Sequence, residues 1–146
     1  MRRFSIEFPE AGIKVSAHMI ENEDHVLADS MWDYLKNPTR FICHHTGSTG
    51  GLINCHPLPP EEYPLIPPVR PFVLCDIRPG QLGWDGNQLL LLYDRCTEPI
   101  IATHAHVAQV DEEDLEAYEK GCRDVWYHCF LYHTLATIIV AREEEA

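Results

Sequence analysis

Several short segments alternate apolar and polar residues with a period of two, and this alternation constrains the chain to a mainly β fold. In the segment RRFSIEF, Phe4, Ile6 and Phe8 fall on one face, with charged or polar residues between them. The segment IKVSAHMI (13–20) alternates in the same way, and the residues PEAG (9–12) join the two segments. Two alternating runs linked by a short turn with proline and glycine predict a β-hairpin at the N-terminus.

Further strands and two helices follow along the chain. We expect strands at 39–45, 72–77, 82–84, 88–95, 99–110 and 134–141, and helices within 22–38 and 111–133. Asp111 is expected to cap the second helix. Residues 52–71 hold seven of the eleven prolines and are expected to form a long ordered loop, because proline lacks the donor that a central strand needs. About six to eight strands with two helices predict a mainly β barrel that carries the helices on its outside.

Charge and cysteine content narrow the class of protein. The 146 residues carry a formal net charge of −12, which argues against nucleic acid and anionic membranes as partners, because both attract clustered lysine and arginine. The start MRRFSIEFPE has no apolar run typical of a signal peptide, and no stretch reaches the roughly 18 apolar residues of a membrane span. The six cysteines form no CxxC pair. We therefore expect a cytoplasmic protein with reduced thiols.

Two longer segments carry a resemblance to a known fold. The segments AHMIENEDHVLADSMWDYL and IRPGQLGWDGNQLLLLYD follow the order of strand, acidic residues, helix and central hairpin. The chain resembles the bacterial cyclophilin-like family of small proteins related to cucumopine synthase. The resemblance implies a single cyclophilin-like domain over residues 1–146: a closed β-barrel with two flanking α-helices and a small-molecule pocket. Cucumopine synthase condenses histidine with 2-oxoglutarate and closes a ring. The Arg-centred and glycine-rich motifs of true cyclophilins are missing here, so prolyl isomerisation is not expected.

Four histidines are the candidate acid–base residues, because the pKa of an imidazole lies near working pH. His44 and His45 are neighbours on an expected strand, so they point to opposite faces and only one can face the barrel interior. His104 and His106 are two residues apart and share a face. Their spacing is also compatible with two ligands of a divalent metal ion. The third ligand of such a metal site would come from His44, His56, Asp76 or Cys55.

The segment TGSTGG (46–51) directly follows His44 and His45. The hydroxyl groups of Thr46, Ser48 and Thr49, together with backbone amides around Gly50, are typical of a loop that holds a carboxylate or phosphate. No GK[ST] follows, so the segment is not a P-loop. The alternative is a flexible hairpin tip without a ligand.

Three further residues are candidates for the wall of the pocket. Arg78 would pair with a substrate carboxylate through two parallel hydrogen bonds, or lie in a surface ion pair. Trp84 and Tyr93 would line the pocket as apolar walls with polar tips, or pack in the core.

The sequence therefore favours a small-molecule enzyme in which a histidine moves protons on a carboxylate-bearing metabolite. The resemblance adds condensation with cyclisation as the reaction class. This interpretation needs no cofactor. One alternative is a metal-dependent enzyme built on His104 and His106. Another is a non-catalytic ligand-binding or assembly module, in which the aromatic C-terminal helix is an interface. We expect a homo-oligomer.

Overall fold

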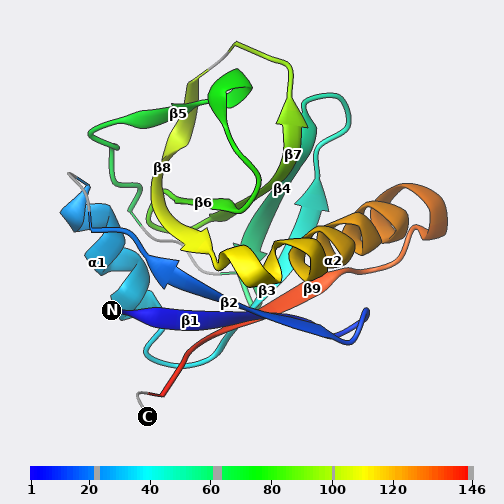
Figure 1. Ribbon diagram of the computed structural model, residues 1–146, viewed down its shortest axis with the longest axis horizontal. Helices are drawn as coiled ribbons and strands as arrows, with labels where there is room; N and C mark the ends of the chain where they lie inside the picture. The colour runs from blue at the N-terminus through cyan, green and yellow to red at the C-terminus, as the bar shows by residue number, and fades with distance from the viewer. Residues whose placement is uncertain (22–23, 61–63, 100, 145–146) are drawn as a thin grey trace.

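The computed structural model describes residues 1–21, 24–60, 64–99 and 101–144, which contain nine strands joined in one sheet. Eight strands close an antiparallel barrel in the order β1–β9–β3–β4–β7–β6–β8–β2, and β5 pairs with the first half of β8 (Figure 1). The expected mainly β closed barrel is confirmed. The strands are β1 (Arg3–Phe8), β2 (Ile13–Met19), β3 (Thr39–His45), β4 (Gly50–Pro57), β5 (Pro71–Val73), β6 (Gln81–Trp84), β7 (Leu89–Cys96), β8 (Ile101–Val110) and β9 (Thr137–Arg142).

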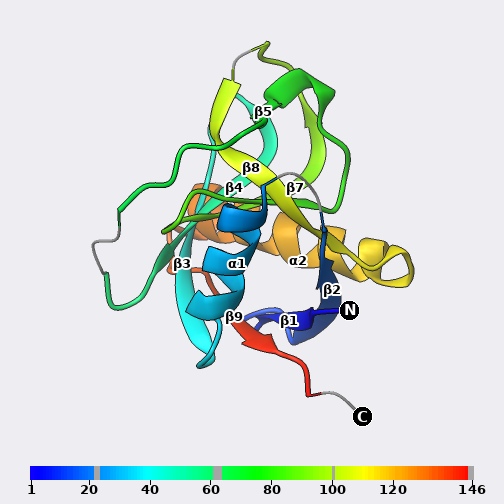
Figure 2. The same ribbon diagram turned by 90° about the vertical axis from the view of Figure 1, so that its left-hand side faces the viewer.

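Two α-helices flank the barrel, as expected, and lie on different sides of it (Figures 1 and 2). Helix α1 (His25–Tyr34) packs its apolar face into the barrel core. Helix α2 (Leu115–Tyr127) follows a short 3-10 turn, η2 (Glu112–Asp114), and continues into the π-helical turn η3 (His128–Tyr132). The α2 side chains that enter the same core are Tyr118, Cys122 and Val125. Among the described residues, no helix has the length and apolar character needed to cross a membrane.

Strand β7 has two apolar environments because it is buried on both faces. Leu89, Leu91 and Tyr93 point into the barrel core. Leu90 and Leu92 point the other way, into a smaller apolar cluster that β5 and the 3-10 turn η1 (Leu74–Asp76) cover. The strand predicted at 88–95 is thus present, and its apolar run Leu89–Leu92 is buried on both faces. Because this second cluster covers part of the outer surface of the barrel, polar side chains next to it can also be partly buried.

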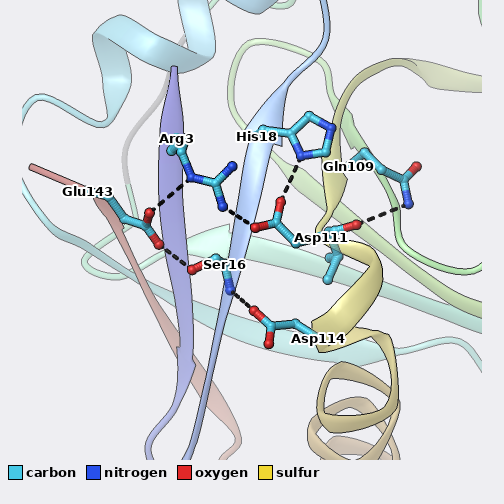
Figure 3. A network of polar contacts seen from close by, with 8 residues as sticks. Arg3, Ser16, His18, Gln109, Asp111, Asp114 and Glu143 are labelled. Atoms are coloured by element: carbon cyan, nitrogen blue, oxygen red, sulfur yellow. Dashed lines mark hydrogen bonds and ion pairs between the residues drawn. The ribbon is translucent and has the colours of Figure 1, made fainter. Parts of the chain in front are cut away.

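A polar network joins β1, β2 and the end of β8, where the barrel closes (Figure 3). The Asp111 carboxylate accepts hydrogen bonds from Arg3 and, at 2.8 Å, from Nδ1 of His18. Burial alone would raise the pKa of Asp111, but these hydrogen bonds outweigh burial and lower it. Neither η2 nor α2 receives a side-chain cap. The expectation that the Asp111 side chain caps the second helix is therefore wrong, because its carboxylate bonds Arg3 of β1 and His18 of β2 instead.

Two further expectations about the strands need correction. The first part of the predicted proline-rich loop is strand β4, in which Cys55 pairs with Cys43 of β3 and Pro57 takes the last position, where a missing donor is tolerated. The strand expected at 72–77 ends at Val73, and η1 replaces its second half. Parts of the predicted helix at 22–38, loop at 52–71 and strand at 99–110 fall on residues 22, 23, 61–63 and 100, which lie outside the described residues.

The contact between α2 and β1 depends on Gly121. A Cβ atom at this position would lie 2.6 Å from Cδ2 of the Phe8 ring, which is closer than real Cβ contacts. We expect Gly121→Ala to lower the free energy of unfolding by about 1–3 kcal/mol through overpacking, although alanine is the better helix former. Gly47→Ala is the matched control, because Gly47 has open space around it and its variant should stay within about 0.5 kcal/mol of the parent. Urea denaturation measures both changes, and a Gly121→Ala variant as stable as the parent would contradict this packing.

Candidate functional site

Strand β3 separates its two terminal histidines, as the sequence predicts. His45 lies on the same side of the sheet as the barrel core and contacts Tyr93 of β7, with ring centroids 5.6 Å apart. His44 is exposed on the outer face, where its ring contacts His56 of β4 at a centroid distance of 5.2 Å. The two neighbouring histidines therefore belong to different environments.

The inward histidine borders a hollow of about 370 Å³, which we call the turn hollow. Three elements build it: the turn between β3 and β4, the end of β7 and the end of α2. Its lining residues are His45, Thr46, Gly47, Ser48, Gly50, Gly51, Tyr93, Asp94, Arg95, Arg123, Trp126 and Tyr127. The structure thus brings five of the predicted site residues together, namely His45, Thr46, Ser48, Gly50 and Tyr93.

Hydrogen bonds fix the orientation of the His45 ring. Its Nδ1 lies 2.8 Å from the carbonyl oxygen of Thr46, which can only accept, so Nδ1 carries the proton. Its Nε2 lies 2.6 Å from the hydroxyl oxygen of Tyr93, and the neutral ring therefore accepts the phenolic hydrogen there. The result is a His–Tyr pair in which the basic nitrogen and the acidic hydroxyl face each other.

Burial changes the acid–base properties of this pair. Burial lowers the pKa of His45 below its usual 6.5, and the hydrogen bond to the Thr46 backbone opposes that shift only in part. Burial also raises the pKa of Tyr93 to about 12, with a smaller contribution from Cys122. Near neutral pH the imidazole is therefore an uncharged base, and the phenol keeps its proton.

Two arginines line the turn hollow, and they differ in their pairing. Arg123 is paired with Glu119 and Asp94 at 2.8 and 3.1 Å, and its guanidinium lies 5.7 Å from the centroid of the Tyr93 ring. Arg95 lines the hollow and makes no ion pair with another residue in the described part of the chain. Arg95 is thus the guanidinium available for an anionic ligand.

The two adjacent glycines of the turn allow β4 to approach β7 closely. A Cβ atom on Gly50, whose φ is +125°, would lie 2.1 Å from the carbonyl oxygen of Arg95, and one on Gly51 would lie 2.4 Å from Cβ of Asp94. The pairing of β4 with β7 also changes register between Gly50 and Leu52. The glycines are therefore needed to place the turn beside the end of β7.

The predicted wall residues Arg78 and Trp84 line neither this hollow nor the outer one described below. Arg78 is exposed on the turn after η1, where its backbone N–H bonds the Gln81 side chain. Because η1 replaces the expected strand there, Asp76 and Arg78 do not share a strand face. Trp84 is fully buried in the barrel core and donates its ring N–H to Ser30 at 3.2 Å.

The second pair of predicted histidines, His104 and His106, lies on the outer face of β8. Ala105 and Val107, which alternate with them, point into the barrel core. His106 packs against Phe72 at a ring distance of 5.6 Å. His104 is buried, and its Nε2 lies 3.6 Å from Oδ2 of Asp85, with no hydrogen-bond partner among the described residues. Burial lowers the pKa of His104, and the nearby Asp85 carboxylate opposes the shift in part. Burial also lowers the pKa of His106.

His104 borders a second hollow of about 500 Å³, the outer-face hollow. It lies against β4, β7 and β8, and Thr46 and Thr49 of the β3–β4 turn reach its edge. Its other lining residues are Leu52, Asn54, His56, Leu74, Gln88, Leu90, Ile101, Ala102, Thr103 and His104. Its lining contains neither lysine nor arginine, in contrast to the turn hollow.

The described part of the chain contains no set of metal ligands of the kind that the metal-dependent alternative requires. No three His, Cys, Asp or Glu side chains there are arranged to hold a metal ion. Of the proposed third ligands, Cys55 is fully buried in the barrel core, on the opposite face of β4 from His56.

Several residues of the two hollows were not among the sequence candidates. Arg95, Arg123 and Trp126 join the turn hollow through the ends of β7 and α2. Asp85 meets His104 only because the β6–β7 hairpin and β8 are neighbours in the barrel. Spacing along the chain does not predict these contacts, and His56 is predicted only as a possible metal ligand.

The buried imidazoles predict how stability depends on pH. The folded-state pKa values of His45, His56, His104 and His106 are all below the ordinary 6.5. The unfolded chain therefore binds more protons than the folded chain once the pH falls below about 6.5. We expect the free energy of unfolding to decrease as the pH falls from about 7 to about 5. His104→Gln should flatten this decrease, whereas His25→Gln, at an exposed position of α1, should not. Urea denaturation across the pH range measures the slopes, and equal slopes in the two variants would contradict the assignment.

Comparisons with known proteins show a fold but no family. No family model matches the sequence, and no curated protein matches it. Among solved structures, the chain is similar to the structure of McbB in complex with tryptophan, with a TM-score of 0.84 and 21% sequence identity. The match covers 98% of this chain and 45% of the McbB chain, so this chain spans less than half the length of McbB. The likeness establishes the barrel fold.

Proposed function

We propose that this protein is a small-molecule enzyme that uses His45 and Tyr93 for acid–base catalysis on a carboxylate-bearing metabolite in the turn hollow. The observation that carries the proposal is the hydrogen bond of 2.6 Å between Nε2 of His45 and the Tyr93 hydroxyl at the wall of this hollow. A buried neutral base that faces a protonated phenol is an acid–base pair with the correct charges near neutral pH.

The two residues have complementary roles. Nε2 of His45 takes the proton from the reacting group, and the carbonyl oxygen of Thr46 then stabilises the imidazolium through Nδ1. The Tyr93 hydroxyl, released from the imidazole, donates its hydrogen bond to the substrate oxygen that gains negative charge. Because the pKa of Tyr93 is raised to about 12, the hydroxyl stays protonated during this step.

The rest of the turn hollow fits an anionic substrate with a planar ring. Arg95 lines the hollow, and a guanidinium can pair with a carboxylate through two parallel N–H groups. Trp126 and Tyr127 supply aromatic surface against which a ring can pack. An aromatic or imidazole-bearing amino acid combines these two features, and the related fold of McbB was solved in complex with tryptophan.

The reaction class we propose is condensation with cyclisation, which the resemblance to the cucumopine synthase family implies. An amine and a 2-oxo acid would join with loss of water, and a ring carbon would then attack the imine carbon. His45 would accept the proton that the ring carbon loses, and the imidazole or indole ring of the substrate would thereby regain its aromaticity. This step needs no oxidant and no metal ion.

Binding of the carboxylate can be tested separately from turnover. We expect L-tryptophan or L-histidine to bind the parent protein in isothermal titration calorimetry, and Arg95→Gln to weaken binding about tenfold through loss of a charge-assisted pair. Arg78→Gln is the matched control, since Arg78 is exposed and lies outside both hollows. An equal loss in both variants would assign the effect to general charge and not to the turn hollow.

Turnover can be tested with L-histidine or L-tryptophan together with 2-oxoglutarate. We expect mass spectrometry to detect a product with the summed mass of the two reactants less one water. His45→Gln and Tyr93→Phe should each lower the rate about 10²–10⁴-fold, which is the usual size of an acid–base contribution.

His25→Gln serves as the control for turnover and should keep the parent rate. Loss of product after treatment with a chelator would favour the metal-dependent alternative. Binding without product in the parent protein would favour the non-catalytic ligand-binding module over the proposed enzyme.

A further inference from the structure

Beside the outer-face hollow lies a buried acidic residue that the proposed function does not use. Asp85 is 3% exposed and follows β6 in the hairpin to β7. Its Oδ1 accepts the backbone N–H groups of Asn87 at 2.9 Å and Gln88 at 2.7 Å, so the carboxylate is held in one orientation. Its Oδ2 points toward His104 and remains available to a further donor.

No permanent cation balances this carboxylate. Among the described residues, Asp85 forms no ion pair with lysine or arginine; its nearest ionisable neighbour is His104 at 3.6 Å, and His56 also lies within electrostatic range. Burial keeps His104 largely uncharged near neutral pH, since its pKa is lowered below 6.5. A buried carboxylate without a counter-ion is costly, so this position favours a positively charged group from outside.

His104 presents a second acceptor beside the carboxylate. The Nδ1 of His104 lies 3.5 Å from the Thr103 hydroxyl, and Nε2 has no hydrogen-bond partner among the described residues. In the tautomer that carries its proton on Nδ1 toward this hydroxyl, Nε2 keeps its lone pair. Two acceptors 3.6 Å apart, Nε2 of His104 and Oδ2 of Asp85, can both bond to different N–H groups of one ammonium ion.

The surroundings of this acceptor pair suit the remainder of such a ligand. His104 borders the outer-face hollow, and Asp85 borders an adjoining apolar hollow of about 430 Å³. Ile101, Ala102 and Thr103 line both hollows, so the acceptor pair lies where the two meet. The proline-rich segment from Leu65 to Pro71 supplies most of the apolar wall.

We propose that the junction of these two hollows is a binding site for a small molecule that carries a protonated amine on an apolar body. The ammonium group bonds Nε2 of His104 and Oδ2 of Asp85, and the apolar body lies against Ile101 and the proline-rich wall. This site is distinct from the turn hollow and has the opposite charge preference, because its lining contains Asp85 and neither lysine nor arginine, whereas the turn hollow contains Arg95 and Arg123 beside Asp94.

Three probes of similar shape test the charge preference: benzylamine, benzyl alcohol and phenylacetate. NMR of the imidazole nitrogens, with the His104 signal assigned from His104→Gln, reports binding near neutral pH. We expect benzylamine to shift the His104 signal in a saturable way and to bind about tenfold more tightly than benzyl alcohol, since an ionic hydrogen bond is stronger than a neutral one. Phenylacetate should leave this signal unchanged.

Two variants assign the effect to Asp85. We expect Asp85→Asn, which keeps the oxygen that accepts from Asn87 and Gln88, to weaken benzylamine binding about tenfold. Asp94→Asn, at an exposed carboxylate of the turn hollow, should leave it unchanged. If Asp85→Asn does not fold, His104→Gln followed by calorimetry with benzylamine replaces it, and binding should again weaken.

The proposal is overturned if phenylacetate shifts the His104 signal as strongly as benzylamine does. Unchanged benzylamine affinity in Asp85→Asn, or in His104→Gln where that variant replaces it, would also overturn it, as would the absence of any shift in the parent protein. None of these outcomes tests the turn hollow. Binding there is tested with Arg95→Gln, and turnover with His45→Gln.

Discussion

The chemistry of this protein depends on the strict alternation of side chains along strands that close into a barrel. Because the barrel has an interior, each residue of β3, β4, β7 and β8 faces either that interior or the outer surface. His45 is turned toward Tyr93, while His44, one residue earlier, meets His56 outside. A shift of β3 by one residue would exchange these two environments. The pairing register, seen in pairs such as Cys43 with Cys55, therefore decides which imidazole faces the barrel interior and which faces outward.

Much of the fold is predictable from sequence because the alternating runs and the helical stripes are local patterns. The N-terminal hairpin, the doubly buried strand around Leu91 and the helix around Tyr118 are all present. The missed strand β4 shows where local patterns fail. Prolines further along drew the whole segment into a loop prediction, although Leu52, Ile53 and Asn54 alternate between the two faces. The position of Asp111 before the second helix predicts a helix cap, because the sequence does not reveal that Arg3 and His18 lie beside its carboxylate.

The candidate site is predictable only for the part that one hairpin contains. His45, Thr46 and Ser48 are close in sequence, so their joint place on the turn hollow follows from the turn alone. Arg95 and Asp85 come from strands and hairpins that meet through barrel closure, which composition and spacing do not report. Arg78 was a reasonable choice for an anion-binding residue by charge alone. Its backbone lies on an exposed turn, and the arginines at the hollow are different ones.

The β3–β4 turn forms a partition shared by the two hollows. Thr46 lines both of them, and its hydroxyl bonds the carbonyl oxygens of Gly50 at 3.3 Å and Leu52 at 3.1 Å, which holds the turn in one shape. Any ligand that displaces this turn alters the volume on its far side as well. A ligand that moved the turn from one side would therefore change the affinity on the other side, and by thermodynamic reciprocity the effect would be equal in both directions. Thr46 is the lining residue that the two hollows share.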